Sequence, residues 1–239
     1  EVEKAVAQYA AEMVHDGDCI QLGFGGIPNA IGFELMNRHD LGIHTEQIGA
    51  SMAHMIQSGV VTNRYKNLDR GWSVGAFIIA DNFTYNYVNN HPRIMMRRGR
   101  YTNDPMIIAQ QDNMVSINAA LQIDLTGQVA AEAIGTVQWS GTGGATDYAY
   151  GAYHSRGGRA MLCQISTAKK GTISRIAPIL DPGSIVSVSR NLTDMVITEY
   201  GVAKLRQRTV KQRVENLIAV AHPDFRAELR KEANKYMYF

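Results

Sequence analysis

Apolar and polar positions along the first third of the chain alternate between helical spacing and short buried runs. Apolar residues within 2–14 recur every three or four positions, which predicts an amphipathic helix that ends at Gly17. The run 18–22 predicts a buried strand, followed by a glycine loop and a helix that opens near Pro28, a favourable first-turn residue. Further expected elements are a short strand at 41–45, a helix at 50–58 ending at Gly59, and a core strand at 74–80.

The remainder of the chain is richer in strand patterns. Residues 114–123 are strand-like, and Thr126-Gly127 is expected to form a tight turn between two strands. A second glycine-rich loop is predicted at 140–152. We then expect apolar runs at 160–165, 173–180 and 184–188, a strand at 195–199, and a charged helical end from about Val202 to Tyr236, broken at His222-Pro223.

No internal repeat or low-complexity linker divides the 239 residues, so one domain is expected over 1–239. The alternation of strands and helices predicts an α/β fold with a mixed, largely parallel sheet flanked by helices on both faces.

Composition excludes several functional classes. A formal charge of +2 is too small to favour nucleic acid, and the short basic stretch 95–100 is interpreted as surface. No apolar run approaches the roughly 20 residues of a membrane span. Cys19 and Cys163 lie far apart in apolar surroundings, which predicts buried thiols rather than a disulfide or metal site. We expect no membrane association and a cytoplasmic location.

Two short motifs resemble functional signatures but lie in the wrong context. The string GWSVG at 71–75 matches the serine-hydrolase pattern, yet a polar stretch precedes Ser73 and a strand-like run follows it, which inverts the required strand–turn–helix order. Asp194 and His222 could serve as the other two members of a triad, but nothing in their sequence setting favours that role. The histidines show no convincing metal-binding spacing, although His44 and Glu46 share a strand face, so no metal site is predicted.

A glycine loop at residues 23–26 follows a strand and precedes a helix, as in dinucleotide-binding loops. The motif requires a third glycine where this chain has Pro28, although the acidic Glu46 lies at about the spacing expected for a ribose contact. A simpler expectation remains, because backbone amides at a helix N-terminus can receive a phosphate or another anion.

Eight stretches in order along almost the whole chain resemble the acetyl-CoA hydrolase/transferase family, which includes 4-hydroxybutyrate and butyrate CoA-transferases. The resemblance identifies the chain with the C-terminal, catalytic half of such proteins. The stretches are LGFGGIPNAIG (22–32), DLGIHTE (40–46), GVVTN (59–63), SINAALQIDLTGQV (116–129), SGTGGATDY (140–148), TISRIAPIL (172–180), ITEYGVAKLR (197–206) and IAVAHPDFRAEL (218–229).

The resemblance implies a nucleophilic role for Glu46, the glutamate that ends GIHTE. In the family this carboxylate attacks an acyl-CoA thioester, and a glutamyl-CoA thioester forms before a carboxylic acid accepts the CoA. Asn103 of TNDP corresponds to a family asparagine that orients the glutamate and contacts CoA. The residues alone leave other interpretations open, since Glu46 fits a solvated or salt-bridged strand end and Asn103 fits a cap for a helix begun at Asp104-Pro105.

The two glycine loops also acquire roles through the resemblance. Gly25, Gly26, Ile27 and Pro28 would line the thioester site, and the amides of Gly143 and Gly144 would help form an oxyanion site, with Asp147 holding that loop. From pattern alone, both loops could be plain turns. Coenzyme A is implied as a substrate together with acyl-CoA and a short-chain carboxylate, and no permanently bound cofactor or metal is expected.

Two departures from the family pattern affect these expectations. The segment after the glutamate usually contains Ser-Asp-Gly, whereas this chain has QIGAS at 47–51, and Ala145 replaces a usual glutamine. Both changes lie beside the expected site and bear on acyl choice and on the balance of transfer against hydrolysis. Family chains also carry another α/β half before the segment where this chain starts, so a truncated chain or a subunit with a partner is expected, as is a homo-oligomer.

The leading hypothesis is therefore transfer of CoA between a short-chain acyl-CoA and an acid of the acetate, butyrate or 4-hydroxybutyrate class. An acyl-CoA hydrolase on the same scaffold is the nearest alternative. A CoA- or dinucleotide-binding module without catalysis, or a regulatory relic, is a different class. A serine esterase built on Ser73 comes last.

Overall fold

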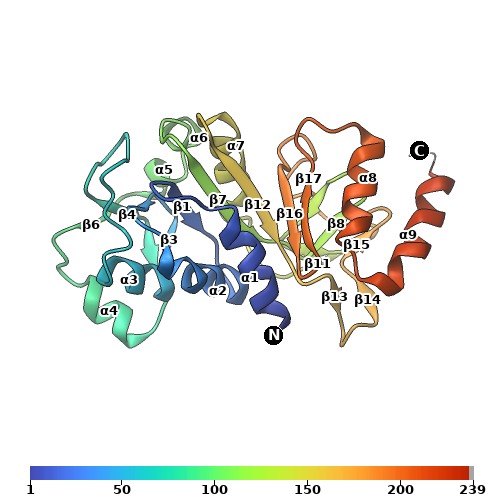
Figure 1. Ribbon diagram of the computed structural model, residues 1–239, viewed down its shortest axis with the longest axis horizontal. Coiled ribbons are helices and arrows are strands. Elements are labelled where there is room, and N and C mark those ends of the chain that lie inside the picture. The colour runs from blue at the N-terminus through green and yellow to red at the C-terminus, as the bar shows by residue number, and fades with distance from the viewer. Residues whose placement is uncertain (237–239) are drawn as a thin grey trace.

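The computed structural model describes residues 1–236 and shows an α/β fold organised around one six-stranded sheet (Figure 1). The strand order is β17-β16-β12-β7-β1-β2. All pairs are parallel except β16 with β17, so the expectation of a mixed, largely parallel sheet is confirmed. These strands are β1 Cys19–Leu22, β2 Gly42–Ile43, β7 Met114–Ala119, β12 Arg159–Cys163, β16 Met195–Thr198 and β17 Gly201–Lys204.

Helices cover both faces of the sheet, and each face carries its own hydrophobic cluster. Strand alternation directs neighbouring side chains to opposite clusters, as Met161 and Leu162 of β12 show. Buried strands with apolar residues on both faces are typical of parallel sheets. One cluster involves α1 Val2–Glu12, α2 Gly26–Glu34 and α3 Ala50–Gln57, and the other involves α7 Ala145–His154, α8 Val210–Ala219 and α9 Pro223–Lys235.

Short helices and strands lie at both ends of this sheet. Between β2 and β7 lie β3 Gln47–Ile48, β4 Ser73–Gly75, β5 Phe77–Ile78, α4 Asn82–Val88, β6 Ile94–Met96, α5 Gly99–Thr102 and α6 Pro105–Ile108, and the 3₁₀ turn Leu35–Asn37 follows α2. Between β7 and β16 lie β8 Gln122–Asp124, β9 Val129–Ala130, β10 Ala133–Ile134, β11 Val137–Gln138, β13 Thr167–Ala168, β14 Ile173–Ser174 and β15 Ile176–Ala177.

Several expected elements are divided differently in the structure. The expected core strand at 74–80 is wrong, because β4 and β5 belong to separate two-stranded ladders and Ile79 is 53% exposed. The strand-like run 114–123 splits into β7 and the start of β8. The loop expected at 140–152 ends at Gly144, where α7 begins. The helical end begins only at Val210, because residues 201–204 form β17.

Other expectations are confirmed. Gly127 adopts a φ of 95° in the turn between β8 and β9, which favours glycine there. Cys19 and Cys163 are free, buried and members of opposite clusters. Burial raises the pKa of Cys19 to about 11 and that of Cys163 to about 12. Within residues 1–236, no helix combines the length and apolar character that crossing a membrane requires.

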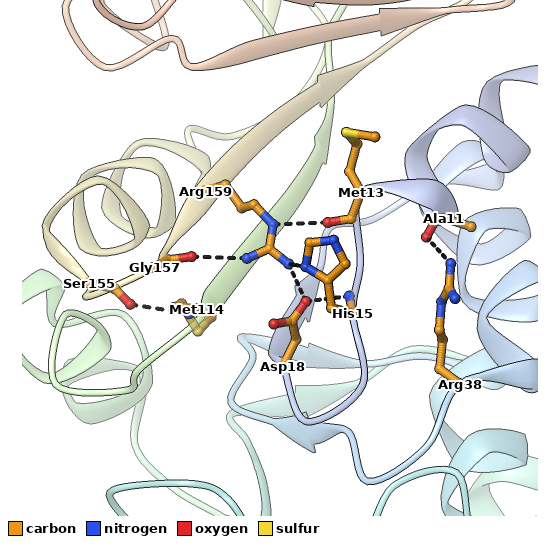
Figure 2. Close-up of polar contacts among 9 residues, drawn as sticks. All are labelled: Ala11, Met13, His15, Asp18, Arg38, Met114, Ser155, Gly157 and Arg159. Atoms are coloured by element: carbon orange, nitrogen blue, oxygen red, sulfur yellow. Dashed lines mark hydrogen bonds and ion pairs between the residues drawn. The ribbon is translucent and has the colours of Figure 1, made fainter.

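An arginine joins the amino ends of β1 and β12 (Figure 2). Arg159 donates to the carbonyl of Met13 at 2.9 Å, to Nδ1 of His15 at 2.9 Å, and to the carboxylate of Asp18. Asp18 also accepts the backbone N–H of His15 at 2.6 Å. The cluster fixes the loop after α1 at the edge opposite to the strand carboxyl ends, which leaves those ends available for a site.

Candidate active site

The carboxyl ends of β1, β2 and β7 meet where the order of the sheet reverses. From β1 the chain passes through α2 to β2 on one side, while β7 lies on the other side and leads on toward β12. Ligands of open α/β sheets bind in the crevice at such a reversal. Two cavities of about 460 Å³ each open here, and both include Leu22, Gly23, Phe24 and Gln47 in their walls.

Glu46 lies just beyond β2 and lines one of these cavities, which we call the first cavity. Its backbone carbonyl accepts hydrogen bonds from Ala76 at 2.8 Å and Phe77 at 3.1 Å, so the main chain at this residue is held firmly. Its side-chain oxygen Oε2 accepts the backbone N–H of Gly144 at 3.1 Å. A carboxylate at the end of one strand is thus fixed against the N-terminus of α7 from a distant part of the chain.

Gly144 and Asn103 approach this carboxylate closely. A Cβ placed on Gly144 would lie 2.5 Å from Nδ2 of Asn103 and 2.8 Å from Oε2 of Glu46. The hydroxyl of Thr102 donates to Oδ1 of Asn103 at 2.9 Å, which leaves the amide nitrogen directed at the carboxylate side. Only glycine leaves room for this arrangement. The alternative helix-cap role for Asn103 is wrong, because the N-cap of α6 is Asp104, which accepts the N–H of Met106.

The two glycine loops line different cavities, which are neighbours. Gly143 and Gly144 share the first cavity with Glu46, and they directly precede α7. Gly25 and Gly26 line the second cavity at the start of α2. Ile27 instead packs against the hydrophobic cluster of the α1 face. The structure therefore gathers Glu46, Asn103, Gly143 and Gly144, and puts Gly25 and Gly26 one cavity away.

Asp147 stands in the first turn of α7, three residues after Gly144. Burial raises its pKa, and the negative charges of Glu46 and Asp104 raise it further. This carboxyl group is therefore close enough to Glu46 to sense its charge, which agrees with a place beside the glycine loop.

Sequence reasoning missed a polar network on the floor of the first cavity. Gln21 and Asn118 exchange amide hydrogen bonds of 2.9 and 3.1 Å, and Ser116 donates to Gln21 at 2.9 Å. Glu132, 5% exposed, has an Oε2 atom without a hydrogen-bond partner among the described residues. Trp139 lies at the rim and is 69% exposed. The available signal was the presence of polar residues within otherwise buried strand segments.

The suggested serine triad is not assembled. Ser73 is fully buried in β4 and its hydroxyl accepts a hydrogen bond from Asn63 at 3.0 Å. Asp194 accepts the backbone N–H of Ala160, while His222 caps α9. Across residues 1–236, no group of three or more His, Cys, Asp or Glu side chains is arranged to hold a metal ion.

His44 contacts the residue that precedes Asn103. Its Nε2 lies 3.1 Å from the carbonyl of Thr102, which also accepts the hydroxyl of Tyr148 at 2.7 Å. Burial lowers the pKa of His44 to about 4, and the positive charge of Lys66 adds to the effect. With that pKa the imidazole is neutral at pH 7, so Nε2–H donates to Thr102.

This depressed pKa predicts an acid-sensitive fold. The unfolded chain takes up a proton at His44 near pH 6.5, whereas the folded chain resists protonation down to about pH 4. Stability should therefore fall as the pH drops through this window, by roughly 3 kcal/mol for a shift of this size. Urea unfolding at several pH values measures it. His44→Gln keeps a donor for Thr102 without titrating, and should show a shallower slope; an equal slope would contradict the assignment.

Comparison with known proteins places this site in a family context. Residues 81–233 match the family model described as the acetyl-CoA hydrolase/transferase C-terminal domain. A succinyl-CoA:cyclohexane-1-carboxylate CoA transferase of Geobacter metallireducens is 47% identical, covering 98% of this chain and 54% of that protein. The 4-hydroxybutyrate coenzyme A transferase of Clostridium kluyveri is 44% identical, covering 98% and 55%.

Solved structures agree with these matches. The crystal structure of RipA from Yersinia pestis superposes with a TM-score of 0.95 at 44% identity, covering 100% of this chain and 54% of that one. The α/β fold with helices around a mostly parallel sheet is thus shared with these proteins. The chain spans about half the length of the curated relatives it matches.

Proposed function

The chain belongs to the acetyl-CoA hydrolase/transferase family, and on that basis we propose that it carries the nucleophilic site of a CoA-transferase. The enzyme would move coenzyme A between a short-chain acyl-CoA and a carboxylic acid. The observation that carries the proposal is the Glu46 carboxylate, held by the N–H of Gly144 beside the amide of Asn103. Family relatives at 41–47% identity that are CoA-transferases support the reaction class.

The proposed reaction begins at the Glu46 carboxylate. One of its oxygens attacks the thioester carbonyl, the carbon–sulfur bond breaks, and CoA leaves as a thiolate, giving a mixed anhydride. The thiolate then attacks the side-chain carbonyl of Glu46, which releases the original acyl group as a carboxylate and leaves a glutamyl-CoA thioester. An acceptor carboxylate reverses both steps, so no net proton or electron is required.

Gly144 and Asn103 suit the charge that develops along this path. Each tetrahedral intermediate carries an oxyanion, and fixed N–H donors stabilise such charge by roughly 3–4 kcal/mol each in a water-poor site. The N–H of Gly144 already points at a Glu46 oxygen, and Nδ2 of Asn103 lies beside the same position. A carboxylate is a weak nucleophile in water, so its fixed position contributes to the rate as well.

We further propose that residues 1–239 act as the C-terminal catalytic domain and that another half, in the same polypeptide or in a partner chain, closes over the cavities. Phe24, 70% exposed, and Trp139, 69% exposed, lie at the rim of the cavity that holds Glu46. Large apolar side chains at a cavity mouth are typical of a surface that another protein segment covers. Assembly into homo-oligomers is part of this proposal.

Transfer and hydrolysis differ in the fate of the thiol. We expect butyryl-CoA and labelled acetate to give labelled acetyl-CoA without a matching rise in free thiol, when the full-length protein is assayed by chromatography and a thiol reagent. Water exclusion favours transfer, because an open site would hydrolyse the anhydride or the thioester. Thiol release that does not depend on acetate would instead assign the chain to the acyl-CoA hydrolases of the family.

A further inference from the structure

The backbone carbonyl of Thr102 is a point where three segments of the site meet. It directly precedes Asn103 in the chain and accepts two hydrogen bonds from side chains. His44, two residues before Glu46, donates one of them at 3.1 Å, and the hydroxyl of Tyr148 donates the other at 2.7 Å. A carbonyl oxygen has two lone pairs, so both are used here. The segment that carries Asn103 is thus tied both to the strand end of Glu46 and to α7.

Tyr148 also belongs to the helix that holds the Glu46 carboxylate. Gly144 donates its N–H to Oε2 of Glu46 at 3.1 Å, and the carbonyl of Gly144 accepts the N–H of Tyr148 at 2.9 Å, one turn further along the helix. The ring of Tyr148 lies 3.3 Å from the position of a Cβ built on Gly144. Tyr148 is therefore bonded through its backbone to one donor of the site, and through its hydroxyl to the residue before the other donor, Asn103.

The side chain of Tyr148 is enclosed and keeps its proton. Its exposed fraction is 0%. Burial raises the pKa of Tyr148 well above its ordinary value, and the negative charge of Glu46 raises it further. The hydroxyl is therefore a donor at neutral pH, and the carbonyl of Thr102 can only accept. Because the direction of this hydrogen bond is fixed, it holds α7 and the Asn103 segment in one arrangement.

We propose that Tyr148 is a positioning residue that sets the spacing between the two N–H donors beside Glu46, the backbone amide of Gly144 and the side-chain amide of Asn103. The inference rests on the proposed transfer of CoA through Glu46. In that reaction the Glu46 oxygen beside both donors carries the oxyanion when the thiolate attacks, so both N–H groups must point at it together. Tyr148 fixes their separation, because it is bonded to the residue of one donor and to the segment of the other.

Replacement of Tyr148 by phenylalanine tests this role with the smallest change. Tyr148→Phe keeps the ring that packs in the core and removes only the hydroxyl, while His44 still holds the carbonyl of Thr102. For butyryl-CoA with acetate and the full-length protein, we expect kcat to fall about tenfold, since a displaced donor stabilises the transition state less well. KM for butyryl-CoA should change less than about twofold, because a fully buried hydroxyl does not contact the substrate.

A second background shows whether the effect passes through Asn103. Asn103→Ala alone should lower kcat by about 10²-fold, as expected for the loss of one oxyanion donor. Once that donor is gone, Tyr148→Phe should lower kcat further by less than about twofold, because two residues that act through one interaction are not additive. An equal loss of kcat in both backgrounds would reduce Tyr148 to a structural role and overturn the proposal, as would an effect on KM alone.

Tyr150→Phe is the matched control. Tyr150 lies on the same helix, is 38% exposed, and packs its ring against His154 with the ring centroids 4.5 Å apart. Loss of a hydroxyl at this position should leave kcat at the wild-type value. All rates are measured well below the unfolding midpoint of each variant, taken from thermal scans, so that every kcat belongs to folded protein. A wild-type kcat in Tyr148→Phe under these conditions overturns the proposal.

The glutamyl-CoA adduct tests the role of Tyr148 and the proposed reaction separately. Intact mass after incubation with butyryl-CoA should show the adduct in wild type and, forming more slowly, in Tyr148→Phe. An adduct that forms in Tyr148→Phe at the wild-type rate overturns only the role of Tyr148. Absence of any adduct and of acetate-dependent exchange in wild type overturns the proposed function itself.

Discussion

Glu46→Gln is expected to abolish the covalent CoA adduct and to lower kcat by at least about 10⁴-fold, because an amide oxygen cannot displace the thiolate as a carboxylate does. Wild-type protein incubated with butyryl-CoA should gain the mass of one CoA less one water, mapped to Glu46 by peptide analysis. The variant should stay unmodified. The fold should be retained, because the glutamine oxygen can still accept the N–H of Gly144.

Glu215→Gln provides the control for this experiment. Glu215 is exposed on α8, away from both cavities, so the same substitution there should leave the adduct and the rate unchanged. An adduct of equal yield on the Glu46→Gln protein would assign the nucleophile to another residue and contradict the proposed mechanism.

Gly144→Ala should be the second most damaging change, with kcat reduced by about 10²- to 10³-fold. The added methyl group would lie 2.5 Å from the amide nitrogen of Asn103 and 2.8 Å from the Glu46 oxygen, so both groups must move. The backbone φ of Gly144 is −100°, which alanine adopts readily, so stability should change far less than activity. Steady-state kinetics and thermal unfolding measure the two effects separately.

Gly99→Ala tests whether loss of a glycine alone explains such a result. Gly99 starts α5, and a Cβ there would meet nothing within 4 Å. Activity and stability should both stay near the wild-type values. Full activity of Gly144→Ala would show that neither the Asn103 amide nor the Glu46 position limits the reaction.

Much of the central sheet could be predicted because its strands are continuous apolar runs. The strand 18–22 and the helix at 50–58 were predicted closely, and both lie in strongly patterned segments. The segment 74–80 was mistaken for a core strand because apolarity alone does not report exposure, and Phe77 and Ile79 face the cavity side of the chain. Most of the segment 201–204 was predicted as helix, because a four-residue edge strand has too few positions to show the alternation of apolar and polar residues that indicates a strand.

The candidate site was likewise predicted only in part from the sequence. Glu46, Asn103 and the 143–144 loop were found through motif resemblance, and the structure brings them together. The separate place of Gly25 and Gly26 could not be foreseen, because it depends on how α2 and α3 pack side by side.

The hydrogen bond between Glu46 and Gly144 joins positions 98 residues apart, and β1 pairs with a strand that begins 95 residues after its own start, as the register of Cys19 with Met114 shows. Contacts of such long sequence separation form late and slowly, because a large loop must close before they stabilise the chain. During refolding, we therefore expect helices to form before the Glu46 carboxylate accepts the N–H of Gly144. Under the proposed function, recovery of CoA transfer during refolding will report completion of the parallel sheet, and fragments of this chain that lack either Glu46 or Gly144 are expected to have no activity, whatever their helix content.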